Sequence, residues 1–200
     1  LFEKGSKMIE NQAAAQASQT KAQSERDELI SQLIEVNAGR AAYYRMLAEL
    51  FFRELTQQQV DHLVGMDFAG MAGDNALIAE GYEDMHRYLR HANSGTRQAL
   101  ACDYAHTFLA AGNYETFAAT PFESVFTSEL GLMMQEARDG VYKMYCEQHI
   151  QPQADLHVPE DHVSFEFEFL ATVIERTNAA LLASDFDRAR DLAQTVSNFH

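Results

Sequence analysis

Hydrophobic side chains recur at spacings of three and four along most of the chain, which is typical of amphipathic α-helices. Phe165, Phe167 and Phe169 alternate with Glu as in a strand, but the longer window around them keeps helical spacing, and neither an internal repeat nor a heptad array is visible. The pattern predicts helices over 24–55, 56–63, 74–89, 96–110, 135–148, 159–182 and 184–200, with one helical turn at 121–126. The chain is therefore predicted to be all-α, a single globular helical bundle of about eight or more helices.

The helix expected at 159–182 is the most hydrophobic, and its first turn is polar. Pro159 suits the first helical position, where a missing N–H costs nothing. Asp161 lies in the first turn, where the helix dipole favours negative charge. His162 and Glu166 are four residues apart, so they can touch on one face. We expect a carboxylate and an imidazole at the mouth of a buried helix.

The first 23 residues differ from the rest of the chain, being rich in Ala, Gln, Ser and Lys with few large apolar groups. We interpret 1–23 as an N-terminal tail or a loose helix, and 24–200 as one all-helical domain that begins near a capping residue, Ser24. No glycine cap closes the last helix before His200. We therefore expect this domain to be truncated at its C-terminus.

Charge narrows the range of partners. The formal net charge is −15, which argues against nucleic acid and against an anionic membrane surface. No run of about 18 apolar residues signals membrane insertion, and no secretory segment is visible. The acidity favours a cationic partner, or serves only solubility. Cys102 and Cys146 form no metal or disulfide pattern, so we expect buried thiols in a reducing cytoplasm.

Catalytic motifs are scarce. The chain has neither a nucleophile elbow nor a glycine-rich phosphate loop. Glu83-x-x-His86 supplies one of the two Glu-x-x-His motifs that a di-iron bundle needs, which leaves a helical carboxylate-metal enzyme as an alternative. A solvated helix face explains this spacing more simply. Asp161 and His162 could also form an acid/base pair, or could simply cap a helix.

Four segments occur in an order and spacing found in a known family. They are Tyr43-Tyr44-Arg45-x-Leu47-x-x-Leu50-Phe51, the helix with Asp103-Tyr104 and Phe108-Leu109, Pro121-Phe122-Glu123-Ser124-Val125-Phe126, and Pro159-x-Asp161-His162. Together they resemble the TorD/DmsD family of redox-enzyme maturation chaperones, over about residues 37–200. The chain departs from the family's pattern at Phe122 and Phe126, where relatives have Tyr, and in having no Trp.

The resemblance implies an all-helical, TorD-like cytoplasmic chaperone that is not an enzyme and needs no cofactor. Its partner would be the twin-arginine signal peptide and the apo form of a molybdopterin-dependent oxidoreductase, held back from export until the cofactor is inserted. The nearest alternative is an assembly factor for a membrane-bound nitrate reductase. A homodimer stays open, because helix exchange between protomers leaves no mark in a sequence. The residues expected to bind the client are Pro159, Asp161, His162 and Glu166, with Asp103, Tyr104, Pro121, Glu123 and Ser124 around them.

The residues themselves fit such a role. Carboxylates offer charge-assisted, bidentate partners to the guanidinium groups of a twin-arginine peptide. An apolar groove containing Phe122, Phe126, Leu132, Met133 and Met134 could take the apolar stretch of the peptide, although an ordinary core is the interpretation we favour. Recognition by Asp161 and His162 requires that a guest polypeptide can reach both side chains.

Overall fold

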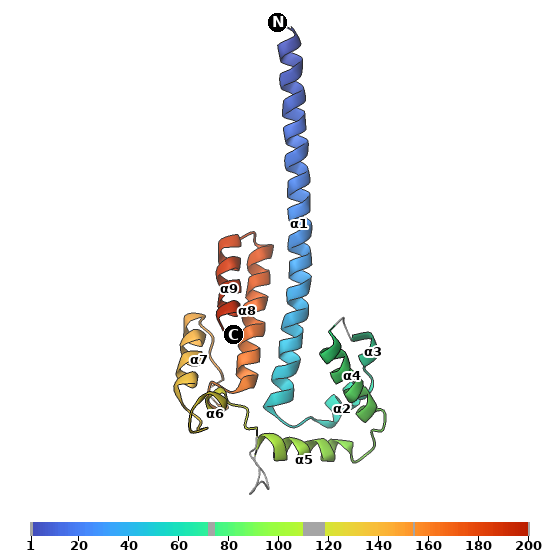
Figure 1. The fold of residues 1–200 in the computed structure, drawn as a ribbon, viewed down its shortest axis with the longest axis vertical. Helices are drawn as coiled ribbons and strands as arrows, with labels where there is room; N and C mark the ends of the chain where they lie inside the picture. Colours follow the sequence, from blue (N-terminus) through green and yellow to red (C-terminus); the bar gives the residue numbers. More distant parts are fainter. Residues whose placement is uncertain (1, 72–74, 110–118, 154, 200) are drawn as a thin grey trace. The chain divides into compact units, whose positions relative to one another are not determined.

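The computed structural model of the chain is built of helices (Figure 1). It describes residues 2–71, 75–109, 119–153 and 155–199. For residues 2–19 and 69 it describes the backbone alone. Within these ranges there are nine helices, which are α1 (Phe2–Phe52), α2 (Gln57–Val64), α3 (Phe68–Met71), α4 (Ala76–Leu89), α5 (Thr96–Phe108), α6 (Glu123–Thr127), α7 (Glu136–Glu147), α8 (Val163–Leu182) and α9 (Phe186–Asn198). The described residues contain no strand, only an isolated bridge between Phe122 and His162. The prediction of an all-α chain is confirmed.

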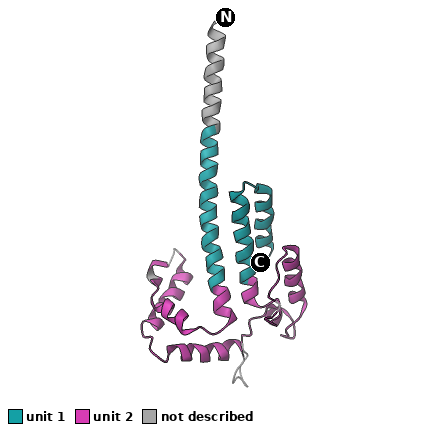
Figure 2. Ribbon diagram, turned by 180° about the vertical axis from the view of Figure 1, so that it is seen from behind, with its two compact units in different colours: residues 1–46, 167–200 teal, residues 47–166 magenta. Residues whose placement is uncertain are grey.

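The chain divides into two compact units (Figure 2). The first consists of Leu1–Met46 and Phe167–His200, and the second of Leu47–Glu166. Over the ranges that the structure describes, none of the helices combines the length and the apolar character needed to cross a membrane.

In the first unit, α8 packs against both α1 and α9. Asn37 Nδ2 donates to Asn178 Oδ1 over 3.0 Å, and Asn178 Nδ2 donates to the carbonyl of Ile34 over 2.9 Å. On the other side, the rings of Phe169 and Phe199 lie 4.8 Å apart. Most of the apolar side chains of α8 are buried, among them Phe169, Leu170, Val173, Ile174 and Leu181. The wide apolar face of α8 therefore reflects burial by more than one neighbour, as the pattern predicted.

Several helix ends were readable from the sequence because capping is local. Thr56, at the start of the helix predicted over 56–63, forms a capping box with Gln59, in which Gln59 N donates to Thr56 Oγ1 and Thr56 N donates to Gln59 Oε1. Asp185 caps α9 by accepting from Arg188 N. Asn75 caps α4, and residue 74, where this helix was predicted to begin, lies outside the described residues.

Three expectations about local structure are wrong. The helix that we expected to begin near Ser24 starts at Phe2, so Ser24 lies inside α1. A short helix, α3, lies between the helices predicted at 56–63 and 74–89, where none was predicted. Cys102 and Cys146 are both exposed. Their sulfur atoms lie on the outer sides of α5 and α7, which an apolar average over a helix does not reveal.

Replacing Thr56 by alanine should lower the free energy of unfolding by about 1 kcal/mol, because the side chain satisfies a free amide at the start of α2. Urea unfolding of the variant, beside Gln58→Ala on the exposed face of α2, measures this. A loss no larger than that of Gln58→Ala would show that the cap does not contribute.

Candidate functional site

The turn that precedes α8 is formed by residues 159–162. His162 serves as the helix cap: its carbonyl accepts from Phe165 N over 2.8 Å, and its Nδ1 accepts from Ser164 N over 3.1 Å. The helix therefore begins at Val163, and the prediction that Pro159 holds its first position is wrong. A histidine ring replaces the Ser, Thr, Asp or Asn that usually caps, so the usual sequence signal was missing here.

Residues 121–124 are joined to this turn by backbone hydrogen bonds. Glu123 N donates to the carbonyl of Asp161, and Val163 N donates to the carbonyl of Pro121, each over 2.9 Å. Asp161 Oδ2 accepts from Ser124 N over 3.0 Å and also from the Ser124 hydroxyl. The structure thus brings together two sequence motifs that are about forty residues apart, as the predicted site required.

The expectation that a guest can reach Asp161 and His162 is wrong. Asp161 is 0% exposed and His162 is 6% exposed. The rings of Phe122 and Phe52 pack edge-on against the imidazole, with centroids at 5.0 and 5.9 Å. Burial lowers the pKa of His162 to about 4, against the opposing charge of Asp161. The ring is therefore neutral near pH 7 and, since Nδ1 accepts a hydrogen bond, carries its proton on Nε2.

A group of carboxyls surrounds the buried aspartate. Burial raises the pKa of Glu166 to about 8, and the charges of Glu123 and Asp161 add to the effect. Burial also raises the pKa of Glu123, again with help from Asp161. Asp161 Oδ1 and Glu166 Oε1 are buried and have no hydrogen-bond partner among the described residues. The cluster is therefore rich in acceptors and poor in donors, a condition that buried groups rarely tolerate.

The expected contact between the side chains of His162 and Glu166 is absent from the described hydrogen bonds. Only their backbones are joined, through Glu166 N and the carbonyl of His162 at 3.3 Å. Because α8 starts after His162, the two residues do not share the regular helical face that their spacing suggested.

The cation beside the turn already has a partner. Arg138 of α7 donates to both oxygens of Glu160, over 2.6 and 2.9 Å, in a bidentate pair. This pairing lowers the pKa of Glu160. The Tyr145 hydroxyl donates to the carbonyl of Glu160 over 3.3 Å. Arg138 thus holds the start of the turn and leaves the Asp161 cluster without a counter-ion from this side chain.

Tyr104 and Asp103 differ in how they relate to the turn. The Tyr104 hydroxyl donates to the carbonyl of Phe51 over 2.9 Å, next to Phe52, which contacts His162. Asp103 is exposed, and no described contact joins it to the turn. Tyr104 therefore lies near the predicted site, whereas the proximity of Asp103 rests on sequence alone.

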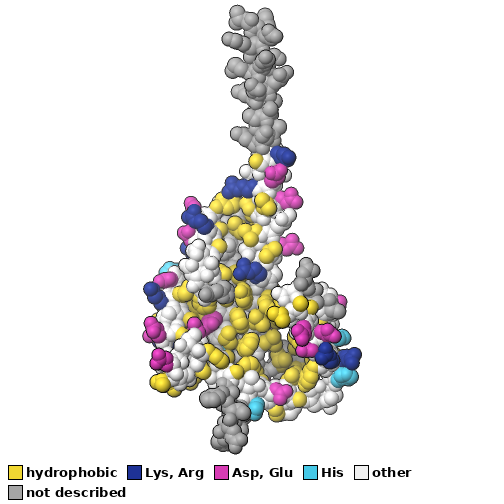
Figure 3. Space-filling view, viewed as in Figure 1, with side chains coloured by type: hydrophobic (Ala, Val, Ile, Leu, Met, Phe, Trp, Pro, Cys, Tyr) yellow, Lys and Arg dark blue, Asp and Glu magenta, His cyan; other side chains and the backbone are white. Residues whose placement is uncertain are grey.

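The end of α6 and the loop that follows it carry the apolar side chains for which we favoured a core role. That expectation is wrong for Phe126, Leu132, Met133 and Met134, which are exposed together with Leu130, from 49% at Met133 to 79% at Leu130. We call residues 126–134 the apolar loop. Figure 3 shows hydrophobic side chains at the surface of the part that carries α6 and α7, with acidic side chains beside them. One sign of this exposure was visible in the sequence, since these residues lack helical spacing and Gly131 interrupts them.

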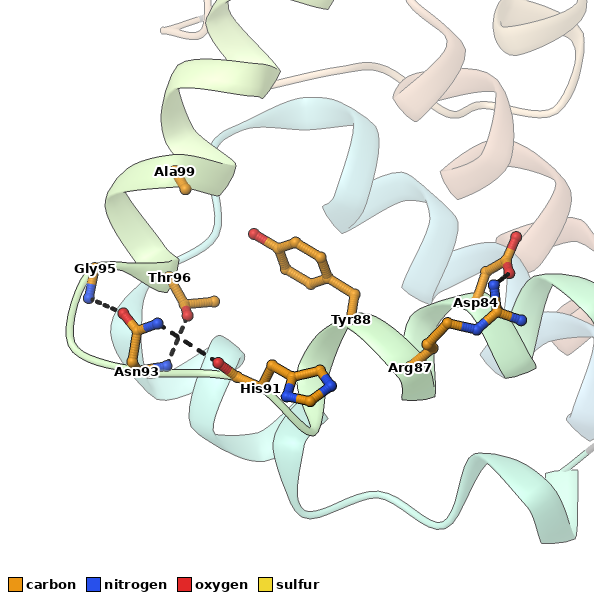
Figure 4. A pocket seen from close by; sticks show the side chains of 8 residues that line it. All are labelled: Asp84, Arg87, Tyr88, His91, Asn93, Gly95, Thr96 and Ala99. Carbon is orange, nitrogen blue, oxygen red and sulfur yellow. Dashed lines mark hydrogen bonds and ion pairs between the residues drawn. The ribbon is translucent and has the colours of Figure 1, made fainter.

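A hollow lies elsewhere in the same unit, between α4 and α5 (Figure 4), with a volume of about 740 Å³. Its polar groups largely satisfy one another: Asn93 Oδ1 accepts from Gly95 N, and Thr96 Oγ1 accepts from Asn93 N, each over 2.8 Å. Arg87 pairs with Asp84 at 3.1 Å. These groups stabilise the connection between the helices.

The proposed metal motif lies on α4. Glu83 pairs with Arg87 at 3.6 Å on an exposed face, and His86 is exposed. Over the described residues, no group of three His, Cys, Asp or Glu side chains gathers in a way that could hold a metal ion. Nothing in this geometry favours the carboxylate-metal enzyme.

Comparisons with known proteins place this geometry in context. Residues 73–200 match the model of a family described as nitrate reductase delta subunit. Several relatives carry the name chaperone protein TorD. One from Vibrio atlanticus is 24% identical over 158 residues, 76% of this chain and 72% of the relative. Those from Aliivibrio fischeri and Vibrio cholerae serotype O1 are 23% and 26% identical, covering 84% of this chain and 80% and 74% of the relatives. No solved structure matches the chain.

Proposed function

Because the chain belongs to the nitrate reductase delta subunit family, we propose that it is a cytoplasmic chaperone for the maturation of a redox enzyme. In this proposal it binds the twin-arginine signal peptide and the apo form of a molybdopterin-dependent oxidoreductase. It aids insertion of the cofactor and proofreads the client before export, without catalysing a reaction. The relatives named as TorD chaperones support this role.

The acceptor-rich cluster is the observation that supports recognition of arginine. Two buried oxygens, Asp161 Oδ1 and Glu166 Oε1, have no donor among the described residues. Repulsion between Glu123, Asp161 and Glu166 contributes to the raised pKa of Glu166. A guanidinium group supplies several N–H donors and a positive charge in one planar group, so it would give Glu166 Oε1 a donor and offset the repulsion among the three carboxyls.

Burial determines which side chains of the site are accessible for direct contact with the peptide. Glu123 and Glu166 are half-buried, whereas Asp161 and His162 are buried. We therefore assign the direct contact with the guanidinium to Glu123 and Glu166. Pro159, Asp161 and His162 then shape the turn from which these carboxyls project.

Binding of a twin-arginine peptide should release close to one proton at pH 7. Glu166 is mostly protonated there, because its pKa is about 8, and a bound guanidinium would favour the carboxylate. Calorimetry in two buffers of different ionisation enthalpy measures the release. Glu166→Gln should abolish the release and weaken binding by about tenfold, or about 1.4 kcal/mol.

The matched control is Glu80→Gln, which neutralises an exposed carboxylate on α4. It should bind the peptide as the natural protein does and release the same proton. Saturable binding with an unchanged release in Glu166→Gln would contradict the role of this cluster, and no binding to the natural protein would contradict the function itself.

The family description favours a second candidate, an assembly factor for a membrane-bound nitrate reductase. Such a factor would recognise its catalytic subunit without an export signal. Purification of the chain from its native host, followed by mass spectrometry of the bound protein, separates the two. A client that carries a twin-arginine signal supports the first proposal, and a nitrate reductase subunit without one supports the second.

A further inference from the structure

The Ser124 hydroxyl links the residues on either side of the apolar loop to the buried Asp161. Asp161 Oδ2 accepts from the Ser124 hydroxyl, just before the loop. The oxygen of the same hydroxyl accepts from Gln135 N over 3.1 Å, just after it. A hydroxyl has one proton to donate and two lone pairs, so Ser124 can make both bonds at once. Ser124 is 0% exposed, so water does not compete for these two hydrogen bonds, which we call the Ser124 clasp.

The loop also holds a defined shape between its ends. Ser128 Oγ accepts from Leu132 N over 3.1 Å, and Gln135 Nε2 donates to the carbonyl of Met133 over 3.0 Å. Met134 has a φ of 61°, in the left-handed region that non-glycine residues rarely adopt. Strain of this kind persists where the surroundings enforce it, and it gathers at binding sites. The side chain of Met134 is itself 56% exposed.

The charges near the loop indicate what kind of partner fits it. Glu129 within the loop and Glu136 at the start of α7 are exposed, and no cation pairs with either among the described residues. An apolar surface with acidic neighbours suits a segment that is apolar and carries positive charge. A neutral or acidic apolar segment would meet uncompensated carboxylates.

We propose that the apolar loop, residues 126–134, is the docking surface for the apolar stretch that follows the two arginines of the client's signal peptide. Asp161 acts on this client as a positioning residue, through Ser124, and does not touch it. This inference rests on the proposed function and adds to it. It also explains how a buried aspartate contributes to the site, because its hydrogen bonds through Ser124 hold the apolar loop in position.

The test compares two peptides, one natural and one whose apolar stretch is replaced by serine and glycine. The natural protein should bind the first at least about tenfold more tightly, a difference of about 1.4 kcal/mol. The double variant Leu132→Ser, Met133→Ser should bind both peptides equally and still release the proton assigned to the arginines. The control Leu77→Ser, which changes a leucine that is 79% exposed on α4, should keep the natural preference.

Ser124→Ala tests the clasp, because it removes the hydroxyl that joins Asp161 to Gln135. It should lose the preference for the apolar peptide, and combining it with the loop variant should weaken binding no further, since both act through one surface. Helicity is expected to stay as in the natural protein. If Ser124→Ala fails to fold, the loop variant alone decides whether residues 126–134 bind.

The outcomes separate the two proposals. A natural protein that binds neither peptide refutes the proposed function. A natural protein that prefers the apolar peptide, with a loop variant that keeps the preference, refutes the loop as the docking surface. Additive losses from Ser124→Ala and the loop variant refute the positioning role. If sedimentation shows self-association that the loop variant abolishes, the surface belongs to a second copy and the inference is wrong.

Discussion

Replacing Glu166 by glutamine should stabilise the fold increasingly as the pH rises, by about 3 kcal/mol more at pH 8 than at pH 5. Burial, with the charges of Glu123 and Asp161, raises the pKa of Glu166 to about 8, whereas in the unfolded chain it lies near the usual value of 4.5. Between these values the folded state holds a proton that the unfolded state has lost. The stability that this carboxyl gives is therefore complete below pH 4.5 and is lost as the pH rises through 8. Glutamine removes this dependence.

Urea unfolding at pH 5, 6, 7 and 8 measures the effect as a difference between the two proteins. His162 contributes in the opposite direction at acid pH: its folded pKa is about 4, so its contribution is lost as the pH falls from about 6.5 towards 4. That loss occurs in both proteins and cancels in the comparison. Glu80→Gln, on exposed α4, should follow the natural protein at every pH. A constant difference for Glu166→Gln would show that this carboxyl ionises freely.

Most of the fold follows from local rules that a sequence carries. Apolar spacing placed the helices, because each helix must bury one stripe of side chains. The capping residues Thr56 and Asp185 marked helix starts, because a cap bonds an amide only two or three positions away. The exception is α8, where the ring of His162 caps the helix, a use of histidine that the usual capping preferences do not contain.

The site could be predicted as a set of segments but not as a surface. The predicted resemblance to the TorD/DmsD family is confirmed by the family match and the relatives. The pairing of Ser124 with Asp161, about forty residues apart, could be anticipated only through that resemblance. Long-range hydrogen bonds then decided which side chains are covered, and no periodicity within one segment reports this. Asp161, a charged residue, is buried, and Met133, an apolar one, is exposed.

Asp161 and Met133 lie where the sequence analysis did not expect them. The charged residue is buried and holds the turn by hydrogen bonds, whereas the apolar residue is exposed to solvent. A buried carboxylate is costly unless it is hydrogen-bonded, and Asp161 Oδ2 has two donors from Ser124. An exposed apolar group costs little stability but offers contact area to a partner. The same turn can therefore fix the loop while its outer carboxyls, Glu123 and Glu166, remain available for a cationic ligand.

A comparison of two phenylalanines distinguishes residues that stabilise the fold from residues that are proposed to bind the client. Phe169 on α8 is 1% exposed, and its ring lies 4.8 Å from that of Phe199. Phe169→Ala should lower the free energy of unfolding by about 3 to 5 kcal/mol, because it leaves a cavity in the first unit. That is a large part of the stability of an ordinary domain.

Phe126→Ala removes an equally large side chain from the apolar loop, where Phe126 is 68% exposed. It should change the free energy of unfolding by no more than about 0.5 kcal/mol, yet weaken binding of the apolar peptide. Urea unfolding and calorimetry on both variants give the two quantities for each. If Phe126→Ala costs as much stability as Phe169→Ala, the loop packs as core and cannot be the surface that waits for a client. If Phe169→Ala costs little, the packing described for α8 is wrong. A large loss of stability in Phe169→Ala, together with weaker peptide binding but little loss of stability in Phe126→Ala, would show that Phe169 stabilises the fold and Phe126 contributes to binding.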